Sequence, residues 1–122
     1  MIRPLNKQTP QIHPSAFISE QAYIVGRVHI GEYSSIWPGT VVRGDSARIK
    51  IGSYVNIQDN SLVHTDNDST YGDYITIGHG VVCHAKTVAN YVLIGNGAVI
   101  NDGAELGEFS IIAAGAVVLE NV

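Results

Sequence analysis

The sequence predicts an all-β fold, a parallel β-helix of about six coils, because it repeats with a period of six residues. A large aliphatic residue recurs at every sixth position, with a slip of three residues after Val42, an acidic insert after Val63 and a one-residue deletion after Cys83. A helix would need a period of 3.6 and a hairpin sheet a period of two, so neither explains the pattern. The series is Ile12, Ile18, Ile24, Ile30, Ile36, Val42, Ile51, Ile57, Val63, Ile77, Cys83, Ile94, Ile100, Leu106, Ile112 and Val118.

A second series, of fourteen residues, lies four positions after these aliphatics and contains only small or β-branched residues. One large and one small inward residue per six are typical of a short strand followed by a corner, and three such units make a coil of about 18 residues. Eighteen units fit between Ile12 and Val118 when two weak positions near residues 70 and 88 are filled. The small series is Ala16, Ala22, Val28, Ser34, Thr40, Ser46, Val55, Ser61, Val81, Thr87, Ala98, Ala104, Ser110 and Ala116.

The 122 residues suffice for one domain with one core. We predict a single β-helix domain over residues 1–122, with an N-terminal extension at 1–11 and an acidic loop insert at 65–74. The net charge of −4 provides no basic footprint for nucleic acid. No apolar run is long enough to span a membrane, and the N-terminus lacks the apolar core of a signal peptide. The one cysteine, Cys83, is expected in the core, excludes an internal disulfide and fits a cytoplasmic location.

Three of the five histidines lie within 21 residues and occupy defined positions of the repeat. His64 follows Val63 and His84 follows Cys83, so both come just after the inward residue of a unit. The 20 residues between them equal one coil of about 18 plus two residues of insert. The two side chains should therefore lie one above the other on adjacent coils, about 4.8 Å apart. Arg43 falls in the same column, one coil before His64.

His79 lies two residues after Ile77 and is expected on or near a different face or corner. Within one chain it should not point at the other two histidines. A triangular prism with ligands along one edge suits a threefold assembly, in which each interface receives His64 and His84 from one subunit and His79 from the next. Stacked surface histidines are often mere surface decoration, but the third histidine and its polar surroundings favour a metal site shared between chains.

Two stretches, VVRGDSARIKIGSYVNIQDNSLVH and TIGHGVVCH, resemble the γ-class carbonic anhydrases and their bacterial relatives. They are similar to the Arg-Gly-Asp, Asn-x-Gln-Asp and His…His-x4-His elements of that family, and the resemblance runs from about Ile12 to Val118. It implies a left-handed parallel β-helix, a homotrimer, and zinc at each subunit interface held by His64, His79 and His84.

The resemblance also implies roles for four further residues. Arg43 and Asp45 would have structural and active-site roles, Gln58 would lie beside the bound water, and Asp59 would form a salt bridge near the interface. Gln58, Arg43, Asp45 and Asp59 are thus the candidate catalytic residues. Such proteins usually continue into a C-terminal helix, whereas this sequence ends at Val122 in mid-repeat, so we expect that the helix is missing or that the chain is a fragment of a longer protein.

The expected function is a zinc-dependent hydration of carbon dioxide to bicarbonate. Three neutral imidazoles leave one zinc position open for water, and zinc lowers the pKa of that water to about 7, which produces a hydroxide able to attack a small-molecule substrate. An all-imidazole set also suits iron, cobalt, nickel or copper. Asp66, Asp68 and Asp73 are expected to form a solvated loop, since an ordinary aspartate pKa near 3.9 makes a poor proton shuttle at neutral pH.

Two alternatives remain open at the level of sequence. A hexapeptide-repeat acyltransferase using an acyl-coenzyme A would share the fold, but it needs one histidine and no metal, so the three histidines argue against it. A non-catalytic trimeric metal-binding scaffold is favoured by Ser46, where well-characterised members carry glutamate, and by the short insert that contains aspartates only. Metal analysis combined with a carbon dioxide hydration assay separates these functions.

Overall fold

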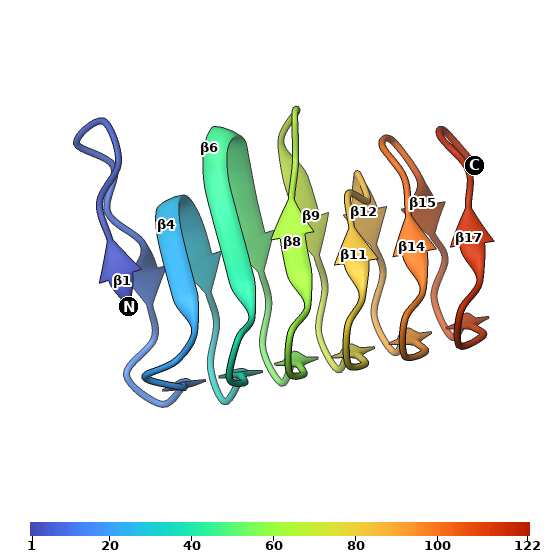
Figure 1. Cartoon of the computed structure of the whole chain (residues 1–122), viewed down its shortest axis with the longest axis horizontal. Helices are drawn as coiled ribbons and strands as arrows, with labels where there is room; N and C mark the ends of the chain where they lie inside the picture. Colours follow the sequence, from blue (N-terminus) through green and yellow to red (C-terminus); the bar gives the residue numbers. More distant parts are fainter.

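The computed structural model describes all residues, 1–122, and contains seventeen strands and no α-helix. The coils stack side by side along one axis, with the two termini at opposite ends (Figure 1). The strands are β1 (Ile2–Arg3), β2 (Gln11–Ile12), β3 (Phe17–Ile18), β4 (Tyr23–Ile30), β5 (Ser35–Ile36), β6 (Val41–Ile51), β7 (Asn56–Ile57), β8 (Leu62–His64), β9 (Ser69–Tyr71), β10 (Thr76–Ile77), β11 (Val82–Cys83), β12 (Thr87–Val88), β13 (Leu93–Ile94), β14 (Val99–Ile100), β15 (Glu105–Leu106), β16 (Ile111–Ile112) and β17 (Val117–Val118).

Every strand pair of the solenoid is parallel, and the strands form three faces of a prism. Face 1 contains the first parts of β4 and β6, followed by β8, β11, β14 and β17. Face 2 contains β2, the second parts of β4 and β6, then β9, β12 and β15. Face 3 contains β3, β5, β7, β10, β13 and β16. The predicted fold, a left-handed parallel β-helix of about six coils, is confirmed.

The inward residues form one column on each face, and together they make the apolar core. On face 3 the column is aliphatic throughout and is fully buried at its centre, for example at Ile57 and Ile77. The two weak positions of the repeat are filled on face 2 by Tyr71 and Val88, which pair in register and are both buried. Cys83 lies in the face 1 column and is fully buried, as predicted.

The predicted small series is wrong at two positions, and both lie where the repeat is irregular. Ser46 is exposed, because the three-residue slip begins there and Ala47 turns inward instead. Thr87 is half-buried on face 2, whereas Ala85 is fully buried at the corner. A shorter or longer unit shifts the turn, so the small inward residue no longer falls four positions after the aliphatic.

The two segments set apart in the sequence both take part in the solenoid. Residues 65–74 contain β9, whose Tyr71 fills a core position, so the irregular part of this segment is shorter than the predicted insert. At the N-terminus, β1 pairs with β4 through Ile2 and Ile24 and so extends face 1. The chain contains no helix of the length and hydropathy needed to cross a lipid bilayer.

The three faces differ in their outward residues. On face 1 the outward column is apolar in every coil: Tyr23, Val41, Leu62, Val82, Val99 and Val117. On face 2 it is polar in every coil: Gln11, His29, Lys50, Thr70, Thr87 and Glu105. On face 3 it is mixed: Phe17, Ser35, Asn56, Thr76, Leu93 and Ile111. Face 1 alone presents a continuous apolar strip.

An aromatic ladder runs along the corner between faces 2 and 3. Neighbouring ring centroids lie 4.9 to 5.3 Å apart, and four of the five rings are parallel within 5°. All five residues have φ between +54° and +61°, a left-handed conformation that non-glycine residues rarely adopt. The ladder consists of Tyr33, Tyr54, Tyr74, Tyr91 and Phe109.

Candidate metal centre

His64 and His84 stack on adjacent coils of face 1. Strand β11 pairs with β8 so that Cys83 lies beside Val63, and this register places the next residue of each coil in one column. The two imidazole centroids are 4.9 Å apart with an angle of 74° between the rings. Arg43 pairs in register with His64, one coil earlier. The column that the spacing predicted is therefore confirmed as a structural feature.

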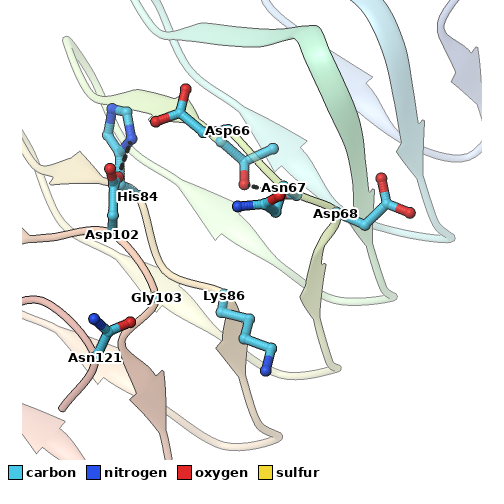
Figure 2. Close-up of a pocket in the computed structure, with 9 residues that line it drawn as sticks. Asp66, Asn67, Asp68, His84, Lys86, Asp102, Gly103 and Asn121 are labelled. Carbon is cyan, nitrogen blue, oxygen red and sulfur yellow. Dashed lines mark hydrogen bonds and ion pairs between the residues drawn. The ribbon is translucent and has the colours of Figure 1, made fainter.

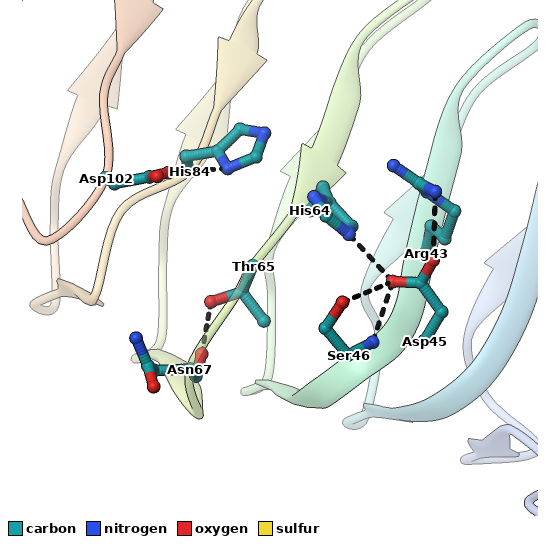
Figure 3. A network of polar contacts seen from close by, with 8 residues as sticks. All are labelled: Arg43, Asp45, Ser46, His64, Thr65, Asn67, His84 and Asp102. Carbon is teal, nitrogen blue, oxygen red and sulfur yellow. Dashed lines mark hydrogen bonds and ion pairs between the residues drawn. The ribbon is translucent and has the colours of Figure 1, made fainter.

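Asp45 joins Arg43 to His64 in a polar network (Figure 3). Its Oδ2 accepts a hydrogen bond from Arg43 Nη1 at 2.9 Å, and its Oδ1 lies 2.7 Å from His64 Nε2. The backbone N–H of Ser46 also donates to Oδ1, at 2.7 Å. Partial burial raises the pKa of Asp45, but the hydrogen bonds from His64 and Ser46 and the charge of Arg43 outweigh it, so the net pKa is below its ordinary 3.8. Asp45 is thus an acceptor that fixes its neighbours.

His79, Gln58 and Asp59 lie together at another place, the corner between faces 3 and 1. His79 is exposed, its Nδ1 lies 3.2 Å from Asp59 Oδ1, and its backbone N–H donates to the side chain of Asn96. Gln58 follows β7 and is half-buried; its backbone N–H donates to Ile77, and its side-chain amide makes no hydrogen bond within the chain. The predicted site residues therefore form two groups on one chain.

His84 faces a polar cavity of about 330 Å³ whose lining includes no hydrophobic side chain (Figure 2). Asp102 Oδ1 lies 2.7 Å from His84 Nδ1, although the two are not aligned as a hydrogen bond, and this buried nitrogen has no other partner. Asp66 lines the same cavity. Sequence reasoning missed Asp102, although its position 18 residues after His84, one coil further on, was a usable signal.

The other two aspartates of the acidic insert, residues 65–74, accept hydrogen bonds from backbone N–H groups. Asp68 Oδ1 accepts a hydrogen bond from the N–H of Arg48 at 3.0 Å, and Asp73 Oδ1 accepts one from the N–H of Ser53 at 2.8 Å. Each bond crosses from one coil to the next. These two carboxylates are structural, although Asp68 also lines the cavity, whereas Asp66 makes no hydrogen bond or ion pair within the chain and lines the cavity beside His84.

The donor set suits a divalent transition metal. Each of the three histidines has one ring nitrogen beside a carboxylate and a second nitrogen without such a contact, which is the arrangement of metal-ligating imidazoles. Within one chain, however, the only three acidic, histidine or cysteine groups close enough to share an ion are Asp66, His84 and Asp102. His79 does not converge with the stacked pair, so a site made of all three histidines requires a second chain.

Comparison with known proteins identifies the family and the relatives of this chain. The sequence matches the bacterial transferase hexapeptide (six repeats) family over residues 9–44 and 86–120, more than half of the chain. It is 49% identical over 110 residues to a carbonic anhydrase of Geobacillus kaustophilus, covering 88% of this chain and 60% of that protein. It is 42% identical to gamma carbonic anhydrase 1, mitochondrial, of Arabidopsis thaliana, covering 93% of this chain and 44% of that protein. The chain thus spans about half the length of these relatives.

Solved structures agree with this relationship. A hexapeptide transferase family protein from Anaplasma phagocytophilum superimposes with a TM-score of 0.95 at 40% identity, covering 98% of this chain and 72% of that one. A putative acetyltransferase of Bacillus cereus superimposes with a TM-score of 0.66 at 34% identity, covering 95% and 76%. The chain therefore belongs to the hexapeptide-repeat transferase family, and within it to the γ-class carbonic anhydrase-like proteins.

Proposed function

We propose that this protein catalyses the reversible hydration of carbon dioxide to bicarbonate at a metal centre held by His64, His79 and His84. The observation that carries the proposal is the stacked His64–His84 pair on face 1, with 4.9 Å between the ring centroids. Two imidazoles at this separation can tilt onto one ion with metal–nitrogen bonds of about 2.0–2.1 Å. The identity of 49% to a carbonic anhydrase supports the same function.

The third ligand comes from a neighbouring subunit of a homotrimer in this proposal. The apolar outward column of face 1 supports such an assembly, because a continuous apolar strip is the surface that association buries. His79 lies at the corner where face 1 begins, and His84 lies where its strand ends. Threefold packing through face 1 would bring one edge of a subunit against the opposite edge of the next and close three equivalent sites.

The other site residues have roles that follow from their contacts. Asp45 and Arg43 orient His64, since the carboxylate bridges the guanidinium and the imidazole. Asp59, whose Oδ1 lies 3.2 Å from His79 Nδ1, would orient His79 through that one contact. Gln58, whose amide makes no bond within the chain, would donate to or accept from a substrate oxygen. A divalent ion held by the three imidazoles would supply Lewis-acid activation of water.

Zinc is the ion we propose, because the reaction needs no redox change. Iron, cobalt and nickel are alternatives that suit the same ligands. A cytoplasmic location is also part of the proposal. It is supported by the single buried cysteine, which needs no oxidising compartment.

An acyltransferase is the second candidate, and one observation favours it. The Bacillus cereus neighbour, which shares the fold at 34% identity, is described as a putative acetyltransferase. That activity would require binding of an acyl-coenzyme A and would be indifferent to removal of metal. A trimeric metal-binding scaffold without activity is the third possibility that the test below distinguishes.

The test measures metal, activity and coenzyme A binding on the same purified protein. We expect about one divalent ion per chain by elemental analysis, carbon dioxide hydration in a stopped-flow pH-indicator assay, loss of that activity with a chelator, and no binding of acetyl-coenzyme A by calorimetry. Metal without hydration in any metal-reconstituted form would contradict the enzyme and favour the scaffold. Acetyl-coenzyme A binding without metal would favour the transferase.

Mixing of two inactive variants tests whether the site is shared. One variant carries His79→Ala, and the other carries both His64→Ala and His84→Ala. Every mixed trimer contains one interface where an intact His64–His84 pair meets an intact His79. Co-refolded protein should therefore regain part of its metal, whereas each variant alone stays empty. Mixed trimers that form without regaining metal would contradict a site built from two chains.

A further inference from the structure

Each of the three candidate ligands has a carboxylate oxygen within 3.2 Å of one ring nitrogen, and each carboxylate comes from a neighbouring coil. The pairs are His64 with Asp45, His79 with Asp59 and His84 with Asp102. The separations along the chain are 19, 20 and 18 residues, close to the length of one coil. The pairing is thus a product of coil stacking. Asp45 and Asp59 belong to the motifs already discussed, whereas Asp102 lies outside them.

Asp102 and His84 could bind one cation together or share a proton, and the distance between Asp102 Oδ1 and His84 Nδ1 distinguishes the two cases. Two ligands on one tetrahedral zinc at bond lengths of 2.0–2.1 Å are separated by roughly 3.3 Å. Asp102 Oδ1 is only 2.7 Å from His84 Nδ1, which is the length of a charge-assisted N–H···O contact. A proton on Nδ1 is therefore the better account. The nitrogen is buried and has no aligned hydrogen-bond partner, so a small rotation of the ring and the carboxylate into line would satisfy it.

We infer that Asp102 is a positioning residue for His84. By accepting the Nδ1 proton, it selects the tautomer in which the Nε2 lone pair is free, and it fixes the ring with that nitrogen away from the carboxylate. Asp66, which also lines the cavity, has a carboxylate oxygen within 4.8 Å of a ring nitrogen of His84 and of an oxygen of Asp102. The metal arm of this inference rests on the proposed function, but the tautomer of His84 is a property of the metal-free chain.

The first arm of the test uses nitrogen NMR on metal-free protein of full length. Signals of the imidazole nitrogens report which nitrogen carries the proton, and His84→Gln identifies the His84 signals by their loss. We expect the Nδ1–H tautomer in the original protein and a shift toward the Nε2–H tautomer in Asp102→Ala. Asp102→Asn keeps a carbonyl acceptor at the same place and should restore the Nδ1–H form. An unchanged His84 tautomer in Asp102→Ala would overturn the inference.

The second arm measures cobalt(II) affinity by competition with a chromophoric chelator. Removal of a carboxylate that hydrogen-bonds to a metal-ligating histidine typically weakens metal binding about 10- to 100-fold. We expect that decrease in cobalt affinity for Asp102→Ala and a smaller decrease for Asp102→Asn. The matched control is Glu105→Ala, which removes the same charge from the neighbouring strand β15, where the Glu105 carboxylate forms one ion pair, with Lys86 at 3.4 Å. Equal cobalt affinity in all four proteins would contradict the positioning role.

The two arms separate this inference from the proposed function. If the original protein binds no cobalt, zinc or iron, the metal centre is wrong, yet the tautomer of His84 in Asp102→Ala still decides the role of Asp102. If cobalt binds and Glu105→Ala weakens it as much as Asp102→Ala does, the effect is general electrostatics and the inference fails. Circular dichroism melts of each variant ensure that only folded proteins are compared.

Discussion

Tyr71 and Cys83 show how single residues are held inside the coil stack. The Tyr71 hydroxyl donates to Cys83 Sγ at 3.2 Å, and both side chains are fully enclosed. Burial, together with the neighbouring thiol, raises the pKa of Tyr71 well above its ordinary 10.0, and burial raises the pKa of Cys83 above 9.0. Both groups therefore stay neutral at physiological pH. Cys83 behaves as a core residue and not as a nucleophile, although it precedes His84.

His84→Ala should remove the bound metal and leave the fold intact. The ring lies outside the coil core, so its loss creates no interior cavity, and we expect a change in stability within about 1 kcal/mol. Elemental analysis and thermal denaturation of the same sample check both expectations. His29→Ala, an exposed histidine on face 2, is the matched control and should keep its metal. Full metal content in His84→Ala would exclude this residue as a ligand.

At the scale of elements, the short strands are stable because each inward residue packs against the inward residues of the coils above and below. Ile36 on β5 and Ile100 on β14 are fully buried, as their place in the repeat predicts. Aspartate at either position would place an unpaired carboxylate in the core. We expect a loss of about 4 kcal/mol or more in the free energy of unfolding for Ile36→Asp and for Ile100→Asp.

Chemical denaturation measures this effect, and Thr70→Asp provides the control. Thr70 is an exposed outward residue of β9, so the same charge change there should cost less than about 1 kcal/mol. If Ile36→Asp or Ile100→Asp denatured at the same concentration as Thr70→Asp, the assignment of inward positions would be wrong.

The aromatic ladder makes a different prediction, because each of its residues combines ring stacking with a left-handed backbone. Tyr74 stacks on Tyr54 and Tyr91 at 4.9 and 5.2 Å and has φ of +56°. Tyr74→Ala loses both stacks, worth about 0.5–1.5 kcal/mol each, and keeps a Cβ in a disfavoured conformation. Tyr74→Gly loses the same stacks but relieves the backbone, so it should be the more stable variant by about 0.5–1 kcal/mol. The reverse order of midpoints in denaturant would show that backbone strain is absent.

At the scale of the whole molecule, the three faces have different outward surfaces and therefore different expected partners. Face 1 is apolar from Tyr23 to Val117 and carries the His64–His84 column at its edge, whereas face 2 is polar throughout. Association through face 1 would bury the strip and bring the candidate metal ligands to the interface in one step. Metal that binds only the assembled form would in turn stabilise it by mass action.

Val82→Glu should therefore disrupt assembly without disrupting the coils. Val82 is an outward residue at the middle of the apolar strip, and burial of its charge in an interface would weaken association roughly 100-fold or more. Analytical ultracentrifugation should show a trimer for the original protein and smaller species for the variant, with unchanged circular dichroism. Thr70→Glu on face 2 is the control and should remain trimeric. A trimeric Val82→Glu protein would mean that face 1 is not the interface.

Much of this molecule was determined by the sequence alone, because each coil contacts only its neighbours and the repeat therefore translates directly into position. Ile36, Ile57 and Ile100 could be assigned to the core, and His64 could be placed beside His84, by counting residues. The handedness of the helix did not follow from the period and came from the resemblance in the Arg-Gly-Asp and histidine motifs.

Only the tertiary structure decided the features that depend on contacts across irregular corners. Ala47 and Ala85 replace Ser46 and Thr87 as inward residues because slips in the repeat move the turn. Asp102 meets His84 because two corners one coil apart align their side chains, which the repeat of inward residues does not describe. Inward positions follow from a period that burial enforces in every coil. Polar contacts between corners follow from local backbone geometry, which no single repeat unit contains.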